Sequence, residues 1–479
     1  MNLSILQSEK IKKRSKIKKI DLFFVVLASL AIVFVWQLFP GAIALLLIII
    51  AVWFFTNNIT YAMYPIILTG FFHGWVINFS QYSLLQKIPL ISAIDTPLVD
   101  LVAIIMGISF IFAVLLKKFS IKKVDINAIL PGIYMYGGFI LISFISAKWF
   151  MFNGYTEIGL KYVLRPITFV FLAYVVLPYL LLKDQKQQYL SIIKTMFWLA
   201  VAIALFGLSS LFVVSHMGWS RIVPYQIFGI SPLGTNHNQL AEVLVALVPT
   251  AWYLYAFAKH KLEGEHASLY AFVAISIMTI ATLTLSRAAW VALAVQACIA
   301  IFYLIRFHWF KVFLKDKSAF ILVLFSPILA YMMFFLGSSI VTSSNVARVD
   351  AASIAYHYSK VSPWVGQGPG SFIYILADTA IFRAEYGDPL DSHGFILKML
   401  LEQGIVGLIL FVMFLLWVIG YVSNSFLHTK DRALVLMVLC SVSGIITFQL
   451  FDTSYYSSIM WLPIGLGLAM VTGVRRIKY

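Results

Sequence analysis

Residues 43–55 read IALLLIIIAVWFF and residues 408–419 read LILFVMFLLWVI, and neither run contains a charged residue. A strand of an outer-membrane β-barrel alternates apolar and polar positions, so continuous runs of this kind favour membrane-spanning α-helices. The whole chain agrees, because 62% of its 479 residues are hydrophobic and only 11% are charged. A soluble protein of this length does not need so much apolar surface. We therefore predict an all-α, polytopic membrane protein.

The apolar segments predict about fourteen transmembrane helices, which form a single integral membrane domain over residues 1–479. If the N-terminus is cytoplasmic, most of the 35 Lys and Arg residues fall in predicted cytoplasmic segments, as the positive-inside rule requires. Both termini are then expected in the cytoplasm. The expected spans are residues 21–39, 41–55, 59–80, 97–116, 126–147, 163–182, 189–214, 237–258, 267–285, 288–305, 319–340, 404–424, 433–450 and 459–473.

The formal net charge of +16 therefore reflects mostly topology, and we expect no nucleic-acid partner. The basic tail at residues 1–20 contains the run KIKKRSKIKK, which fits a topology anchor attracted to anionic lipid better than a nucleic-acid arm. The span that follows is long and lacks a small-residue cleavage site, so a signal peptide is not expected. Cys298 and Cys440 both lie in apolar spans and indicate core residues rather than a disulfide or metal site.

The longest polar interruption is the segment 341–393, which we expect to be one large extracytoplasmic loop. Two short helices are expected in it, at residues 351–360 and 372–384, on either side of the turn PWVGQGPGSF at residues 363–372. No strand precedes the glycines and no Lys-Ser/Thr follows them, so the turn is not a nucleotide-binding P-loop. A tight hinge between two surface helices and a contact with ligand both remain open for it.

Four arginines fall in the predicted outer half of the protein: Arg165, Arg221, Arg287 and Arg348. Arg287 lies between two apolar segments, where a guanidinium is unfavourable unless it is paired or faces water. It is also the side chain best suited to bind phosphate with two parallel hydrogen bonds, although an arginine at the head-group level is the alternative. Arg165 is an interfacial anchor or an anion-binding residue. The sequence indicates anion binding less strongly for Arg221 than for Arg165.

His393 is the candidate general base, because a neutral imidazole can take a proton from a hydroxyl near neutral pH. Asp391, two residues earlier, can fix its tautomer. His237 is a second candidate at the start of a span, where capping a helix is the commoner role. Glu402 lies half a helical circle away from His393 and is expected to pair with Lys398, or to orient an arginine.

The sequence contains no His/Cys/Asp/Glu spacing typical of zinc and no paired Asp-x-Asp in an outer loop to hold a divalent cation. We therefore expect a mechanism without a metal or another cofactor.

Taken together, these residues resemble the bacterial O-antigen ligase and O-antigen polymerase superfamily of membrane glycosyltransferases. The local resemblance covers residues 281–424, and the many-span layout fits the whole chain. The matching features are Ser286-Arg287 at the head of a span, Arg348, the turn Pro363-x-x-Gly366-x-Gly368-x-Gly370, His393, and Glu402-x-Gly404-Ile405-x-Gly407-Leu408.

The resemblance implies an enzyme of the cytoplasmic (inner) membrane that acts on polyprenyl-diphosphate-linked glycans at the outer face. Arg287 and Arg348 would hold the diphosphate, with Arg165 as a helper, and His393 would deprotonate the acceptor hydroxyl for an inverting transfer. Arg221, His237, Asp391 and Glu402 are the remaining expected substrate-binding residues. The expected partners are the lipid-linked glycan, the bilayer and other polysaccharide-assembly proteins.

Gly394 follows His393, where the family often has asparagine, so we expect a polymerase of cell-surface polysaccharide repeat units rather than a ligase. A lipid-linked oligosaccharide flippase is the alternative from another class. A flippase should carry charges in both halves of the protein, whereas the predicted spans before residue 140 have almost none beyond Asp100. A channel or small-solute transporter would not require the long outer loop.

Overall fold

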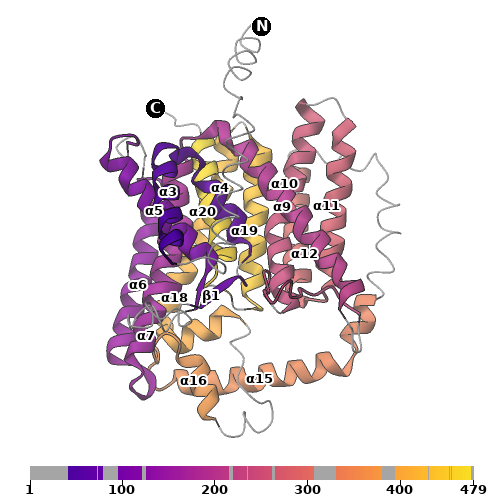
Figure 1. The fold of residues 1–479 in the computed structure, drawn as a ribbon. Helices are drawn as coiled ribbons and strands as arrows, with labels where there is room; N and C mark the ends of the chain where they lie inside the picture. The colour runs from indigo at the N-terminus through magenta and orange to yellow at the C-terminus, as the bar shows by residue number, and fades with distance from the viewer. Residues whose placement is uncertain are drawn as a thin grey trace.

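The computed structural model describes residues 41–72, 74–78, 95–120, 126–214, 220–234, 236–261, 265–306, 331–379, 394–429, 431–452, 454 and 456–475. These residues form mainly long helices that run side by side, with two further helices, α15 and α16, lying across one end of the bundle (Figure 1). The all-α prediction is therefore confirmed for this part of the chain.

Helices occupy most of the predicted spans that fall within the described residues, and a short strand pair was not predicted. Their bounds are α3 (Gly41–Asn57), η1 (Ile59–Tyr61), α4 (Met63–Gly70), β1 (Val76–Asn78), β2 (Asp95–Pro97), α5 (Leu98–Leu115), α6 (Leu130–Trp149), η4 (Phe152–Gly154), α7 (Thr156–Tyr162), η5 (Val163–Phe169), η6 (Leu172–Val176), α8 (Leu177–Leu182), α9 (Lys186–Val213), α10 (His237–Lys261), α11 (Glu265–Leu283), α12 (Arg287–Arg306), α15 (Ser339–Ser359), α16 (Ser371–Asp378), α18 (Phe395–Ser425), η7 (Phe426–His428), α19 (Arg432–Gln449) and α20 (Ser458–Val474).

Seven helices in the described ranges are long and apolar enough to cross a membrane, consistent with a polytopic membrane protein. Three shorter apolar helices, at Ala267–Leu283, Arg287–Tyr303 and Ser458–Val474, accompany them. The predicted total of fourteen is not confirmed. The expected span at residues 21–39 and most of the one at 319–340 lie outside the described residues, and the side of the membrane on which each terminus lies stays a prediction.

The first described helices differ from the prediction. We expected two separate spans at residues 41–55 and 59–80, whereas Leu46–Asn57 and Ile59–Gly70 are bent by 107° at a short break. Together they count as at most one span, which raises the number of candidates to eight. The chain then forms the short antiparallel pair of β1 and β2, in which Ile77 pairs with Thr96.

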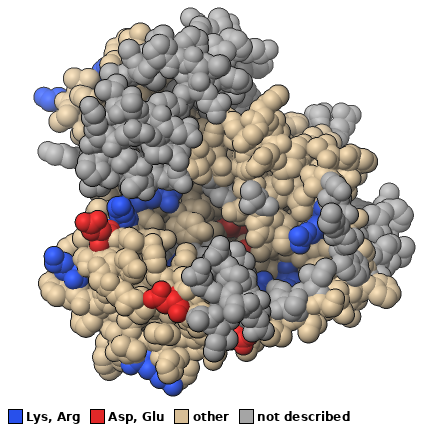
Figure 2. Space-filling model, turned by 60° about the horizontal axis from the view of Figure 1, so that its bottom comes forward, with Lys and Arg blue, Asp and Glu red and all other residues tan. Residues whose placement is uncertain are grey.

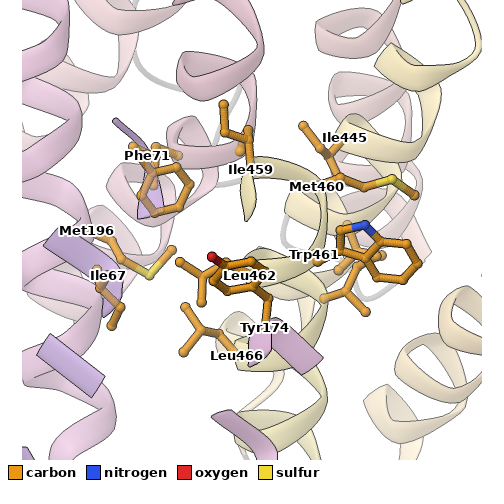
Figure 3. Close-up of a cluster of buried hydrophobic side chains, with 14 of the residues drawn as sticks. Ile67, Phe71, Tyr174, Met196, Ile445, Ile459, Met460, Trp461, Leu462 and Leu466 are labelled. Carbon is orange, nitrogen blue, oxygen red and sulfur yellow. The ribbon is translucent and has the colours of Figure 1, made fainter. Parts of the chain in front are cut away.

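The core of the bundle is built around α20, whose side chains are almost all buried. Figure 3 shows part of it, where residues of α4, η6, α9, α19 and α20 pack together around Trp461 and Leu462. Gly465 allows α20 to lie directly against η6, because a Cβ at this position would meet the carbonyl oxygen of Tyr174 at 2.0 Å. Close packing of this kind drives helix association in lipid, where apolar burial gives no advantage.

The segment predicted to be the large outer loop contains the two expected helices with different bounds. α15 begins at Ser339 rather than at residue 351, because the polar stretch before residue 351 continues the helix without an apolar period that could reveal it. α16 begins at Ser371, one residue before the expected start, and ends at Asp378. The last residues of that predicted helix, from 380 on, lie outside the described part.

The glycine-rich turn packs against a break in α18. Gly404 interrupts that helix with φ 67° and ψ −170°, which leaves backbone groups of the helix without their usual partners. The turn supplies new partners, and an added Cβ at Gly366 would lie 2.3 Å from the carbonyl carbon of Glu402. The backbone hydrogen bonds run from Gln367 N to Leu401 O (2.7 Å), Gly368 N to Glu402 O (3.0 Å), Ile405 N to Pro363 O (2.8 Å) and Val406 N to Trp364 O (3.2 Å). Docking on α18 therefore accounts for Gly366, and both the hinge and the ligand contact stay predictions for the turn.

Candidate functional site

Arg287 is placed by the sharp connection between α11 and α12. Leu285 has a left-handed backbone conformation, with φ 59°, which turns the chain so that α12 starts at Arg287. Trp290, one turn later, donates from Nε1 to the carbonyl of Thr282 at 3.0 Å and packs edge-on against Phe335. A left-handed conformation at a non-glycine residue is unfavourable and persists only where the surroundings enforce it.

Arg287 and Arg348 meet across the interface of α12 and α15. Arg287 Nη1 donates a hydrogen bond to Asn345 Oδ1 at 2.5 Å, and Arg348 follows three residues later on the same helix. Arg348 Nε is buried and has no hydrogen-bond partner among the described residues. The pKa of Arg348 is lowered by burial and then by the charge of Arg287, whereas Asp452 raises it. Two neighbouring guanidinium groups with an unsatisfied N–H form a site suited to an anion.

Arg221 and His237 join the same cluster. The segment that carries Arg221 is fixed against the end of α11, because Ile222 N donates to Leu283 O at 3.0 Å. Tyr331 Oη also donates to Ser220 O at 2.6 Å. His237 is the first residue of α10 and lies within electrostatic range of both Arg221 and Arg348. Four of the predicted residues therefore converge at one end of the bundle; we call Arg221, His237, Arg287 and Arg348 the cationic cluster.

Basic and acidic side chains surround a hollow on this face of the molecule, as Figure 2 shows with the end that carries α15 and α16 turned toward the viewer. Two acidic residues near the cationic cluster were missed by the sequence analysis. Asp452 follows α19 and acts electrostatically on Arg348, and Glu242 is buried on α10. The sequence did hold a signal for Asp452, since it is an acidic residue at the predicted outer end of the span 433–450.

Arg165 is not part of the cationic cluster. Its Nε donates to Asp100 Oδ2 at 2.7 Å, and the same carboxylate accepts a hydrogen bond from Tyr174 Oη at 2.5 Å. Its segment, η5, packs against α6 and α7, on the opposite side of the bundle from α12 (Figure 1). The described structure thus gives Arg165 a protein carboxylate as partner and does not bring it to the cationic cluster.

Glu402 is fully buried and forms the expected pair with Lys398, with 4.0 Å between Nζ and Oε1. Its Oε1 also accepts a hydrogen bond from Phe372 N at 3.3 Å, in the first turn of α16. A carboxylate at a helix N-terminus is favourable. The observed contacts of Glu402 therefore hold α16 on α18.

His393 and Asp391 lie outside the described residues, so their contacts remain untested. Gly394, the next residue, has φ 117°, and an added Cβ there would lie 2.4 Å from the carbonyl oxygen of Leu450. Gly394 therefore lies directly beside Leu450, in the turn that carries Asp452. The described part of the chain contains no group of three His, Cys, Asp or Glu residues that could hold a metal ion, and the metal-free mechanism stays a prediction.

The structure and its site define a polytopic membrane protein that is helical apart from the short β1–β2 pair, with a cluster of arginines at one end. Residues 270–412 match the family model described as O-antigen ligase, which confirms the predicted resemblance to the O-antigen ligase and polymerase superfamily. The match runs from α11 into α18 and includes Arg287, Arg348 and the glycine-rich turn. It supports membrane glycan processing of the ligase or polymerase type. No curated protein matches the chain.

Proposed function

We propose that the protein polymerises polyprenyl-diphosphate-linked oligosaccharide repeat units into a cell-surface polysaccharide, at the outer face of the cytoplasmic membrane. The observation that carries this proposal is the convergence of Arg287 and Arg348 within the region that matches the O-antigen ligase family. A lipid diphosphate is the anion that such a pair can bind at the end of a membrane bundle, because guanidinium groups fit phosphate oxygens with paired hydrogen bonds.

In the proposed reaction, an acceptor hydroxyl attacks the anomeric carbon of the sugar on the lipid carrier. A new carbon–oxygen bond forms, the bond to the diphosphate oxygen breaks, and its electron pair leaves with the lipid diphosphate. Arg287 and Arg348 stabilise the charge that develops on this leaving group. Attack from the opposite side inverts the anomeric configuration, and the diphosphate needs no metal ion if the two guanidinium groups balance its charge.

His393 is the proposed base that takes the proton from the attacking hydroxyl. The contacts of the next residue support this role. Gly394 lies against Leu450, and the turn that carries Leu450 also carries Asp452, which acts electrostatically on Arg348. Arg221 and His237 are proposed to extend the anion site around the sugar-phosphate part of the donor. Asp391 would orient His393. The contacts of Glu402 and Arg165 support an indirect role for these two residues, rather than binding of the substrate.

The ligase activity is a second candidate, because the matching family model is described as O-antigen ligase. A ligase transfers a finished glycan to a different acceptor, whereas a polymerase joins two lipid-linked glycans. The chemistry at the anomeric carbon is the same in both reactions. The acceptor therefore distinguishes the two, and neither the cationic cluster nor the leaving group does.

The test uses the full-length protein, purified in detergent and supplied with lipid-linked repeat units. We expect glycan chains to lengthen and free lipid diphosphate to appear, with both lost in Arg287→Ala and Arg348→Ala. Lys360→Ala is the matched control, because Lys360 directly follows α15 and its ammonium group lies 4.7 Å from the centre of the Tyr356 ring. Release of lipid diphosphate only when a separate glycan acceptor is added indicates the ligase. Wild-type protein that binds the lipid but transfers nothing to either acceptor contradicts an enzyme and favours the flippase.

A further inference from the structure

Glu242 is an acidic residue inside the helix bundle that the proposed chemistry does not use. Only 1% of its surface is exposed. Its Oε1 accepts hydrogen bonds from Gln449 Nε2 at 2.6 Å and from Ser454 Oγ at 2.5 Å. A carboxyl group in such a place is unfavourable unless its hydrogen bonds are satisfied, and intramembrane acids usually have a role beyond stability.

The partners of Glu242 form a closed network between two parts of the chain. Gln449 is the last residue of α19, and its Oε1 accepts a hydrogen bond from Ser454 N at 2.8 Å. Its Nε2 also donates to Ser454 Oγ at 2.5 Å. These bonds attach the turn after α19, described at Leu450, Phe451, Asp452 and Ser454, to α10, which lies more than two hundred residues earlier in the sequence.

This turn carries groups that belong to the proposed site. Asp452 acts electrostatically on Arg348, and its backbone N donates to Phe448 O at 3.1 Å. The carbonyl of Leu450 lies against Gly394, the residue before α18. A shift of the turn would therefore move Asp452 relative to Arg348 and would displace the start of α18.

We propose that Glu242 is a positioning residue for glycosyl transfer, which holds the turn after α19 through Gln449 and Ser454. That turn places Asp452 within electrostatic range of Arg348 and lies against Gly394, the residue before α18. This inference rests on the proposed function. Misplacement of reacting groups by about 1 Å can lower a rate by about a hundredfold, so a network of this kind affects catalysis without contacting the substrate.

Gln296 offers a matched control for a purely structural role. It is also fully buried and joins the same helices in the middle of the bundle, where its Nε2 donates to Val245 O at 2.9 Å and Cys440 O at 3.1 Å. Loss of either side chain leaves polar groups without partners inside the protein. Only Glu242 is connected to the turn that carries Asp452.

The experiment compares Glu242→Met with Gln296→Met in full-length protein, with kcat and KM for lipid-linked repeat units and the melting temperature as readouts. We expect both variants to melt at a lower temperature than wild type. Glu242→Met should lower kcat about 10- to 100-fold with little change in KM, whereas Gln296→Met should keep kcat. Glu242→Gln keeps an oxygen that accepts both hydrogen bonds and should recover most of the lost kcat.

Gln449→Leu provides a second variant that cuts the same network. It should lower kcat as Glu242→Met does, and the double variant should lose no more than either single variant, since both changes remove one unit. If Glu242→Met does not fold, Gln449→Leu is judged by the same criteria.

Unchanged kcat in Glu242→Met, or an equal loss in Glu242→Met and Gln296→Met, overturns the positioning role while leaving the proposed function intact. A loss that Glu242→Gln does not recover also overturns it. Wild-type protein without any transfer overturns the proposed function itself, and the positioning role falls with it.

Discussion

The ammonium group of Lys398 lies 4.0 Å from the carboxylate of Glu402, one turn further along α18, and neither side chain is exposed. Lys398 Nζ also lies 5.8 Å from the centre of the Tyr456 ring, in the turn before α20. Glu402 accepts a hydrogen bond from Phe372 N in α16. One buried pair thus connects α18 to α16 and to the segment before α20.

Lys398→Met should destabilise the protein strongly, because it leaves the Glu402 carboxylate buried without its cation. Removing one partner of a buried ion pair costs about 3–5 kcal/mol. The double variant Lys398→Met, Glu402→Gln removes both charges and should be more stable than the single variant. Thermal unfolding in detergent measures the difference, with the exposed Lys360→Met as control. Equal melting temperatures for wild type and Lys398→Met would show that the pair is not important for stability.

The contact between the glycine-rich turn and the break in α18 leads to a second prediction. Gly366→Ala and Gly404→Ala should each destabilise by at least about 2 kcal/mol, because both residues have positive φ and an added Cβ would overlap backbone atoms. Gly137→Ala is the control, since its Cβ would meet nothing within 4 Å and alanine favours a helix. Melting temperatures of the three variants measure the effect. Tolerance of alanine at Gly366 and Gly404 would mean that the turn does not dock as described.

Much of the fold could be predicted from the sequence. A span in lipid must form all its backbone hydrogen bonds within the helix, and it must be apolar over the thickness of the bilayer. The span expected at residues 237–258 is α10, and the one expected at 433–450 is α19 within a residue or two. The bend between α3 and α4 could not be predicted in this way, since both arms are apolar. α15 was also predicted too short, because its first half has no apolar period.

The candidate site was predicted in part. The sequence indicated Arg287 because charges are rare in apolar segments and Arg348 because it is an arginine of the predicted outer half, and the structure brings the two together. It could not indicate that Arg165 would pair with Asp100, nor that Glu242 would bind Gln449, because these contacts arise only when distant segments pack. For the same reason it could not decide between the hinge and ligand contact for the glycine-rich turn.

The cationic cluster should bind pyrophosphate, which is the simplest molecule with the proposed anionic group. Millimolar pyrophosphate should raise the melting temperature of wild-type protein and should protect Arg348→Ala and Arg287→Ala much less, because binding to the native state stabilises it. Sulfate at equal ionic strength controls for general salt effects. Arg348→Lys should keep the charge but lose the paired hydrogen bonds, and it should be protected less than wild type. Equal protection of all variants would place the anion outside the cluster.

The pair of Asp100 and Arg165 leads to a further prediction, which separates support of the fold from substrate binding. Arg165→Gln leaves the buried Asp100 carboxylate with Tyr174 as its remaining hydrogen-bond partner, so both stability and transfer should fall. The double variant Asp100→Asn, Arg165→Gln removes both charges and should recover stability and, with it, most of the transfer activity. Melting temperature and release of lipid diphosphate are measured on the same preparations. If the double variant is as stable as wild type but remains inactive, Arg165 contacts the diphosphate after all, and the ion pair with Asp100 serves to orient its guanidinium.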